Sequence, residues 1–199
     1  MDKSLINSFF LIISITLLAC QQEEQVLIDI EGNTYPIKNY DGTIWMLENL
    51  KVKKDQSGKD IKFYFPNDDP VNEADFALLY DYAIACQVCP KGWELPSNAD
   101  WEKLWSTQPQ PLASAFKDGN YWANEQNTND SGFMVRPAGY ANQGEFDNFF
   151  GARSIFWSKT DNSEHIWTFI FEKGKNTIRS AEQHPTYAFS VRCIKRQKQ

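Results

Sequence analysis

The chain has 199 residues and a net charge of −6, and hydrophobic residues make up 42% of it. An acidic chain without a basic stripe lacks the electrostatic footprint of a nucleic-acid-binding protein, so nucleic acid is not expected as a partner. Aromatic residues make up 15% of the chain, including seven Trp, which predicts a well-packed core. A chain of this length is expected to form one domain.

The first 19 residues have the features of an export signal. Lys3 supplies the positive start, and residues 9–18 form an apolar run that is too short to span a bilayer. The run ends in Leu-Leu-Ala-Cys at 17–20, which resembles a bacterial lipobox. By that resemblance, residues 1–19 are a lipoprotein signal peptide and Cys20 is the lipidated first residue of the mature chain. The alternative is an ordinary cleaved signal in which Cys20 falls by chance.

Residues 20–25 are expected to form a short tether. The sequence Gln-Gln-Glu-Glu-Gln at 21–25 is polar and acidic, a composition typical of flexible segments. An acidic run directly after the lipidated cysteine resembles the surface-export signal of Bacteroidetes lipoproteins. The predicted localisation is therefore the outer membrane, at the cell surface, with the periplasmic face as the alternative and the membrane as a partner through the lipid anchor.

The mature chain begins with short strands. Residues 26–30, 34–37 and 44–47 are apolar or β-branched and are separated by Glu-Gly-Asn and Asp-Gly turns. Residues 51–70 then form a charged connection rich in Lys, Asp, Gly and Pro.

Two helices are predicted between residues 72 and 106. The first begins near Asn72, with Asp75 as a capping partner. Its buried stripe comprises Phe76, Leu79, Tyr80 and Ala83. The second begins at Ser97, with Asp100 at the third helical position. Its inward face comprises Trp101, Leu104 and Trp105.

A long polar region at 106–131 without strong periodicity follows the second helix, and the rest of the chain is strand-like. Strands are predicted at 133–140, 154–158, 165–172 and 187–194. The order of strands, two helices, loops and strands predicts an α+β fold, formed by a single domain over 26–199.

The cysteines of the mature domain favour a disulfide. In the last strand, Cys193 alternates onto the apolar face, and Cys89 opens the segment CPKGW. In an exported protein these two form a strong disulfide candidate. The alternative is a redox pair of Cys86 and Cys89, but that motif follows a helix, whose negative end disfavours a thiolate. Cys86 is then expected to be a buried free thiol.

Several segments together resemble the Fibrobacter succinogenes major paralogous domain: DIEGNTYPIKNYDGTIWMLENLKV, ALLYDYAIACQVCPKGWELPSNADWEKL, SGFMVRPAGY, FWSKT and YAFSVRCIK. The resemblance covers residues 28–195. It implies a relationship to the C-type lectin-like superfamily, which includes the formylglycine-generating enzymes. It also implies a C-type lectin-like fold, with two helices flanking small twisted antiparallel sheets, and the pairing of Cys89 with Cys193.

No metal or other cofactor is expected. The two histidines, His165 and His184, lack cysteine or carboxylate neighbours at zinc-ligand spacing. The loop at 124–130 carries the carboxylate and amide oxygens that calcium prefers, but not the triplets of sugar-binding C-type lectins. Calcium therefore stays possible, and a solvated polar loop is the other interpretation.

Aromatic residues beside amides and carboxylates in loops are the elements of a glycan or peptide site. The candidate ligand-binding residues are Tyr121, Trp122, Asn124, Gln126, Glu145, Asp147 and Phe149. The alternative is that Trp122 and Phe150 are core residues reached from loops.

The predicted function is a non-catalytic, surface-anchored binding module that recognises a glycan or a protein of the cell envelope. The first alternative is a structural subunit of a surface assembly. The second is an enzyme related to the formylglycine-generating proteins. Those relatives use a cysteine pair, and here one of the two plausible cysteines, Cys89, is already assigned to the disulfide, so an enzyme is not expected.

Overall fold

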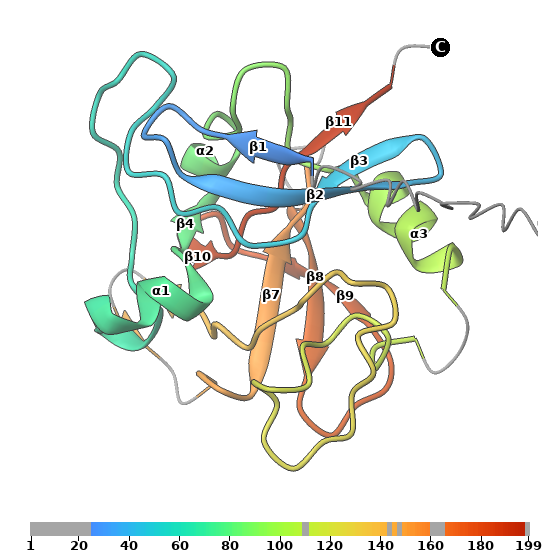
Figure 1. Ribbon diagram of the computed structural model, residues 1–199. Helices are drawn as coiled ribbons and strands as arrows, with labels where there is room; N and C mark the ends of the chain where they lie inside the picture. Colours follow the sequence, from blue (N-terminus) through green and yellow to red (C-terminus); the bar gives the residue numbers. More distant parts are fainter. Residues whose placement is uncertain (1–24, 109–111, 143–144, 147–148, 160–165, 198–199) are drawn as a thin grey trace, which may run out of the picture.

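The computed structural model describes residues 25–108, 112–142, 145–146, 149–159 and 166–197. The predicted signal peptide, Cys20 and most of the predicted tether lie outside these ranges. Within them the chain forms three small antiparallel sheets and a few short helices, so the predicted α+β class is confirmed (Figure 1). No helix among the described residues has the length and apolar character needed to cross a membrane.

The first sheet brings the two ends of the domain together. Its order is β1 (Val26–Ile28), β2 (Thr34–Tyr40), β3 (Thr43–Met46) and β11 (Ile194–Arg196). The turn between β2 and β3 requires Gly42, which has a φ of +86°. The three predicted N-terminal strands are therefore present, and the C-terminal strand β11 pairs antiparallel with β3.

A three-stranded sheet forms the centre of the molecule (Figure 1). It consists of β7 (Arg153–Trp157), β8 (Ile166–Glu172) and β9 (Arg179–Gln183). The apolar strands β7 and β8 match the prediction. β9 was not predicted, because its sequence RSAEQ is polar and mostly exposed, as an edge strand permits.

The smallest sheet has the order β4 (Tyr80–Asp81), β10 (Tyr187–Phe189), β5 (Ala141–Asn142) and β6 (Glu145–Phe146). The predicted strand at 133–140 is wrong, since that segment is irregular and joins the sheets only through single bridges.

The predicted first helix is broken into two. α1 (Glu73–Phe76) ends at Ala77, whose φ of +64° is incompatible with a helix. The Leu79 N–H then donates to the Tyr64 carbonyl at 2.9 Å, and the chain becomes helical again only in α2 (Tyr82–Ala85). Tertiary hydrogen bonds therefore override the helical periodicity of this segment. Two 3-10 turns precede α1: Pro66–Asp68 and Pro70–Asn72.

α3 (Asn98–Ser106) begins as the sequence predicts. The Ser97 hydroxyl accepts from the Asp100 N–H at 3.3 Å, and the Asp100 carboxylate accepts from the Ser97 N–H at 2.8 Å, which together form a capping box. Trp101 is fully buried, with its ring 4.7 Å from that of Trp45 on β3. This contact fixes α3 against the first sheet.

The predicted disulfide is present. Cys89 and Cys193 are joined with an S–S distance of 2.10 Å and a Cα–Cα distance of 5.7 Å. The expectation that Cys86 is buried is wrong, because α2 ends before it and leaves its side chain exposed.

The last predicted strand, at 187–194, does not alternate as expected. Regular pairing stops at Phe189 and resumes at Ile194, and the residues between are covered on both sides. Arg192 is therefore buried as deeply as Cys193.

Candidate functional site

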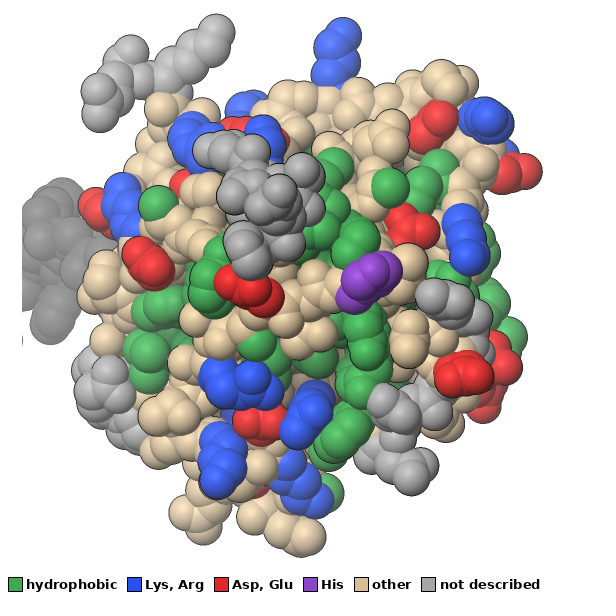
Figure 2. Space-filling model, turned by 180° about the vertical axis from the view of Figure 1, so that it is seen from behind, with side chains coloured by type: hydrophobic (Ala, Val, Ile, Leu, Met, Phe, Trp, Pro, Cys, Tyr) green, Lys and Arg blue, Asp and Glu red, His purple; other side chains and the backbone are tan. Residues whose placement is uncertain are grey.

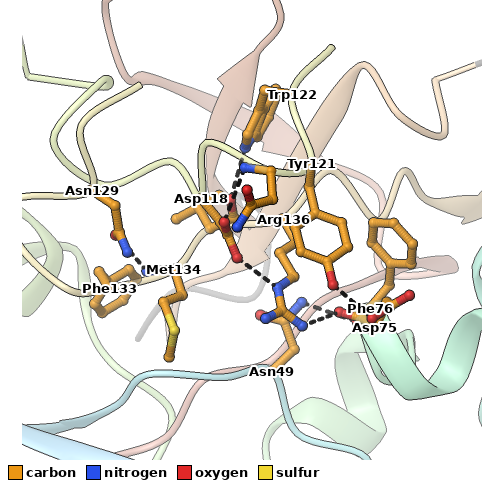
Figure 3. Close-up of polar contacts among 12 residues, drawn as sticks. Asn49, Asp75, Phe76, Asp118, Tyr121, Trp122, Asn129, Phe133, Met134 and Arg136 are labelled. Atoms are coloured by element: carbon orange, nitrogen blue, oxygen red, sulfur yellow. Dashed lines mark hydrogen bonds and ion pairs between the residues drawn. The ribbon is translucent and has the colours of Figure 1, made fainter. Parts of the chain in front are cut away.

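The candidate site lies where α1 meets the loop around residues 133–136 (Figure 3). A small hollow of about 20 Å³ opens there, which is room for about one water molecule. Its lining is mostly charged: Glu48, Asn49, Lys51, Glu73, Ala74, Asp75, Phe76, Ala77, Met134, Arg136 and Arg192. The hollow itself is too small for a ligand larger than water.

The base of the hollow is the guanidinium of Arg192, which is 1% exposed. It donates to Asn49 Oδ1 at 2.9 Å, to the Met134 carbonyl at 2.9 Å and to the Phe133 carbonyl. It also lies 4.3 Å from the centre of the Phe133 ring. Burial lowers the pKa of Arg192, and the nearby charge of Glu48 opposes that shift.

The wall of the hollow is Arg136. Its Nε donates to Asp118 Oδ2 at 3.0 Å, and its Nη1 donates to the Asp75 carbonyl at 2.8 Å (Figure 3). The guanidinium lies 4.3 Å from the centre of the Tyr121 ring, a cation–π distance. One side chain thus joins α1 to the loop that carries Tyr121.

The predicted site residue Tyr121 is half-buried beside these groups (Figure 3). Its hydroxyl donates to Asp75 Oδ1 at 2.6 Å, and this hydrogen bond to a carboxylate raises the pKa of Tyr121. Phe76 meets the Tyr121 ring edge-to-face at 5.4 Å and the Phe150 ring at 4.8 Å. We call this group, Asp75, Phe76, Tyr121, Arg136 and Phe150, the Tyr121 surface.

Trp122 does not belong to this surface, although it follows Tyr121 in sequence. It is 1% exposed, and its indole N–H donates to the Val135 carbonyl at 2.7 Å. The ammonium of Lys117 lies 4.5 Å from the centre of its ring. The expectation that Trp122 contacts a ligand is therefore corrected, because its indole ring lies in the core.

Two further candidates, Asn124 and Gln126, are exposed. Gln126 borders a separate polar hollow of about 270 Å³, whose lining also includes Ser114, Asn127 and Asn176. Gln126 therefore lies beside a different hollow from the one that Asp75 and Arg136, the partners of Tyr121, line.

The candidates from the second predicted loop are also apart from Tyr121. Glu145 is exposed, and Asp147 lies outside the described residues. Phe149 stacks on Tyr140 at 5.8 Å and lies under the guanidinium of Arg153 at 3.8 Å. Its neighbour Phe150, by contrast, reaches the Tyr121 surface.

The described residues contain no group of three or more His, Cys, Asp or Glu side chains placed to hold a metal ion. In the loop at 124–130, the ammonium of Lys117 lies 2.8 Å from Glu125 Oε2. Burial alone would raise the pKa of Glu125, but the contact with Lys117 and the hydrogen bonds that the carboxylate accepts outweigh burial and lower this pKa. His184 is exposed, and His165 lies outside the described residues.

Sequence reasoning missed Asp75, Phe76, Arg136 and Arg192 as site residues. For Arg192, a signal was available: it is a lone charge between Val191 and Cys193 in an otherwise apolar segment. For Asp75 and Arg136, which lie 61 residues apart in sequence, local patterns carry no such signal.

Comparison with protein-family models matches residues 39–195 to the Fibrobacter succinogenes major domain. The chain therefore belongs to this family. Searches of the curated proteins and of the solved structures gave no match.

Proposed function

We propose that this chain is a non-catalytic binding module held at the outer face of the bacterial outer membrane by a lipidated Cys20. The lipobox-like residues at 17–20 and the acidic run at 21–25 support this location. Several acyl chains on one residue give stable anchoring, whereas a single chain gives only marginal binding.

We further propose a C-type lectin-like topology for the domain. Three features support it: small antiparallel sheets, the pairing of β11 with β3 near the N-terminus, and the disulfide of Cys89 with Cys193. In such folds a long loop outside the sheets carries specificity, and Tyr121 lies in the corresponding long segment after α3.

The observation that carries the binding function is the Tyr121 surface. It combines half-buried aromatic rings with the carboxylate of Asp75 and the guanidinium of Arg136. Flat apolar faces beside fixed hydrogen-bonding groups suit the ring faces and hydroxyls of a sugar. A glycan is therefore the ligand class that this surface favours, and an envelope protein is the alternative.

The hollow beside this surface is lined by side chains that contact one another. Its arginines are already hydrogen-bonded to carbonyl, amide or carboxylate oxygens. These groups serve to position the aromatic surface.

The test is a glycan array probed with the lipid-free protein and with two variants. Tyr121→Ala removes the ring from the surface. Phe63→Ala is the control, because Phe63 is also half-buried but pairs with Phe65 at 5.4 Å and does not belong to the Tyr121 surface. We expect array binding that survives EDTA, is lost in Tyr121→Ala and persists in Phe63→Ala.

Two results would contradict this proposal. If Tyr121→Ala binds glycans as well as the original protein does, the binding site does not include the Tyr121 surface. An array without binding, together with a stable complex recovered by pull-down from native envelopes, would favour the structural-subunit alternative. Thermal unfolding of each variant shows whether the fold is intact.

A further inference from the structure

The first strand of the domain exposes a stripe of aliphatic side chains. Val26 is 47% exposed, Ile28 59% and Ile30 52%, and these are three of the four exposed large hydrophobic residues among those described. They alternate with Leu27 and Asp29, which are each only 8% exposed. We call Val26, Ile28 and Ile30 the β1 stripe. Some exposed apolar surface is ordinary, as the green side chains in Figure 2 show. Here, however, two exposed aliphatic side chains lie on the outer face of β1 and the third, Ile30, lies in the turn directly after it.

The stripe is rigidly presented. The Asp29 carboxylate accepts from the Glu31 N–H at 2.9 Å, from the Asn33 N–H at 3.0 Å and from the Tyr35 hydroxyl at 2.7 Å. These bonds fix the turn that follows β1. The strand also pairs with β2 over Val26–Ile28, so its outward side chains cannot fold back onto the core.

An apolar groove with a cationic rim adjoins the stripe. It has a volume of about 320 Å³. Its apolar lining includes Leu27, Ile28, Ile30, Val52, Val88 and Pro90. Lys54 and Lys91 also line it. The Lys54 ammonium is paired with the exposed carboxylate of Asp60 at 2.7 Å, and the one acid among the lining residues, Asp29, is buried and engaged by hydrogen bonds. Aliphatic side chains beside lysines match the boundary between acyl chains and anionic headgroups.

The position of the stripe in the chain indicates which surface it contacts. Val26 lies six residues after Cys20. Even fully extended, six residues span at most about 20 Å. A lipid on Cys20 therefore keeps β1 close to the headgroups of the same bilayer. This step rests on the proposed lipidation of Cys20.

We propose that the β1 stripe, with Lys91 at the rim of the groove, docks on the lipid surface that carries the anchor. The contact adds a second, non-covalent attachment and holds the domain in one orientation on the membrane. A partner strand added to the β1 edge is less suited to these observations, because β1 is only three residues long and offers few backbone groups to a partner.

The test places the photocrosslinking residue p-benzoylphenylalanine at Ile28 in the full-length lipidated protein in cells. Val71 is the matched control position, since it is 71% exposed and also aliphatic but lies in the 3-10 turn Pro70–Asn72 that leads into α1, an element separate from β1 in Figure 1. We expect an adduct that carries radiolabelled lipid phosphate at position 28 and none at position 71. A protein adduct at position 28, equal lipid adducts at both positions, or no lipid adduct at position 28 would each overturn the proposal.

Lipidation is measured separately, from the mass of the N-terminal peptide of the mature protein. An unmodified Cys20 would contradict the anchoring part of the proposed function. A lipidated Cys20 without a lipid adduct at Ile28 would contradict membrane docking alone. The two failures are therefore distinguishable.

Discussion

The central sheet and the long segment after α3 are ordered in different ways. β7, β8 and β9 are joined by continuous antiparallel ladders, with β8 paired on both sides. Residues 107–108 and 112–140, the described part of the long segment, contain no helix or strand. Nevertheless the segment buries large side chains: Phe116, Trp122, Phe133 and Val135. The buried N–H and C=O groups of this segment do not pair in a β-ladder, so they need other hydrogen-bonding partners.

Backbone hydrogen bonds within the segment supply many of these partners, such as the bond from the Asp118 N–H to the Val135 carbonyl at 2.9 Å, and side chains from elsewhere supply others. The hydroxyl of Tyr40 donates to the Ser131 carbonyl at 2.7 Å, and Arg192 donates to the Met134 carbonyl at 2.9 Å. From within the segment, the buried Lys117 ammonium donates to the carbonyls of Glu172 at 2.8 Å and Lys175 at 3.0 Å. The Tyr121 surface is thus positioned by side chains, which makes it more sensitive to single substitutions than the central sheet.

The largest expected effect comes from Arg192→Met. It keeps apolar bulk but leaves the carbonyls of Phe133 and Met134 and the amide of Asn49 without their donor. We expect the free energy of unfolding to fall by about 3–5 kcal/mol, the range for breaking a buried charged network. Chemical denaturation measures it. The control is Arg179→Met, whose side chain is 49% exposed and whose loss should cost less than about 1 kcal/mol. Similar losses for both variants would show that Arg192 has no special role.

The disulfide should have a smaller effect. Cys89→Ser and Cys193→Ser should each lower the free energy of unfolding by about 2–5 kcal/mol, since the bond closes a separation of 104 residues. The double variant should lose little more than either single one, because both remove the same bond. Cys86→Ser is the control, and as a surface change it should stay within about 0.5 kcal/mol. Peptide mapping that links Cys86 to Cys89 would contradict this assignment.

Alkaline pH should weaken the fold through buried tyrosines. Burial raises the pKa of Tyr40 to about 12 and the pKa values of Tyr35 and Tyr80 well above 10. Above pH 10 the unfolded chain loses these three protons first, so stability is full below pH 10 and falls as pH rises from 10 to 12. We expect a loss that approaches about 4 kcal/mol per pH unit once the three hydroxyls are ionised in the unfolded chain.

Denaturant titrations at pH 9, 10 and 11 measure this loss. Tyr40→Phe removes one of the three titrating groups, so the loss of unfolding free energy should become smaller by about 1.4 kcal/mol per pH unit. Stability that is constant across this range would contradict the burial of the three hydroxyls.

The smallest effect concerns the cap of α3. Ser97→Ala removes the hydroxyl that accepts from the Asp100 N–H and should cost about 1 kcal/mol. Ser106→Ala, at the other end of the same helix, is the control and should be nearly neutral, since Ser106 is exposed at the C-terminal end. Denaturation midpoints compare the two. A neutral Ser97→Ala would mean that packing of Trp101 alone positions the helix.

Local chemistry made part of the fold predictable. The capping box of Ser97 and Asp100, the apolar runs of β7 and β8, and the pairing of Cys89 with Cys193 were each anticipated. In these cases the signal lies in adjacent residues, or in a family resemblance that covers most of the chain.

Tertiary partners made the rest unpredictable. The helical stripe that begins at Phe76 is interrupted because the Leu78 N–H donates to the Leu50 carbonyl at 3.3 Å, a contact that no local pattern reveals. Likewise, Tyr121 and Trp122 were predicted together as ligand-binding residues, but only Tyr121 is half-exposed, whereas Trp122 is in the core. In a loop whose hydrophobic residues show no periodicity, the sequence indicates which chemical groups are available but not which side chains face outward.

Native-state hydrogen exchange tests most directly whether the two regions differ as described. Exchange free energies are compared for the amides of Asp118, Val135 and Ser131, which bond within the long segment, and for the amides of β8. We predict that the long segment opens at a lower free energy than β8, which exchanges only on global unfolding. Equal free energies for the two sets would contradict the account, since the side-chain contacts would then order the segment as cooperatively as the ladders order the sheet.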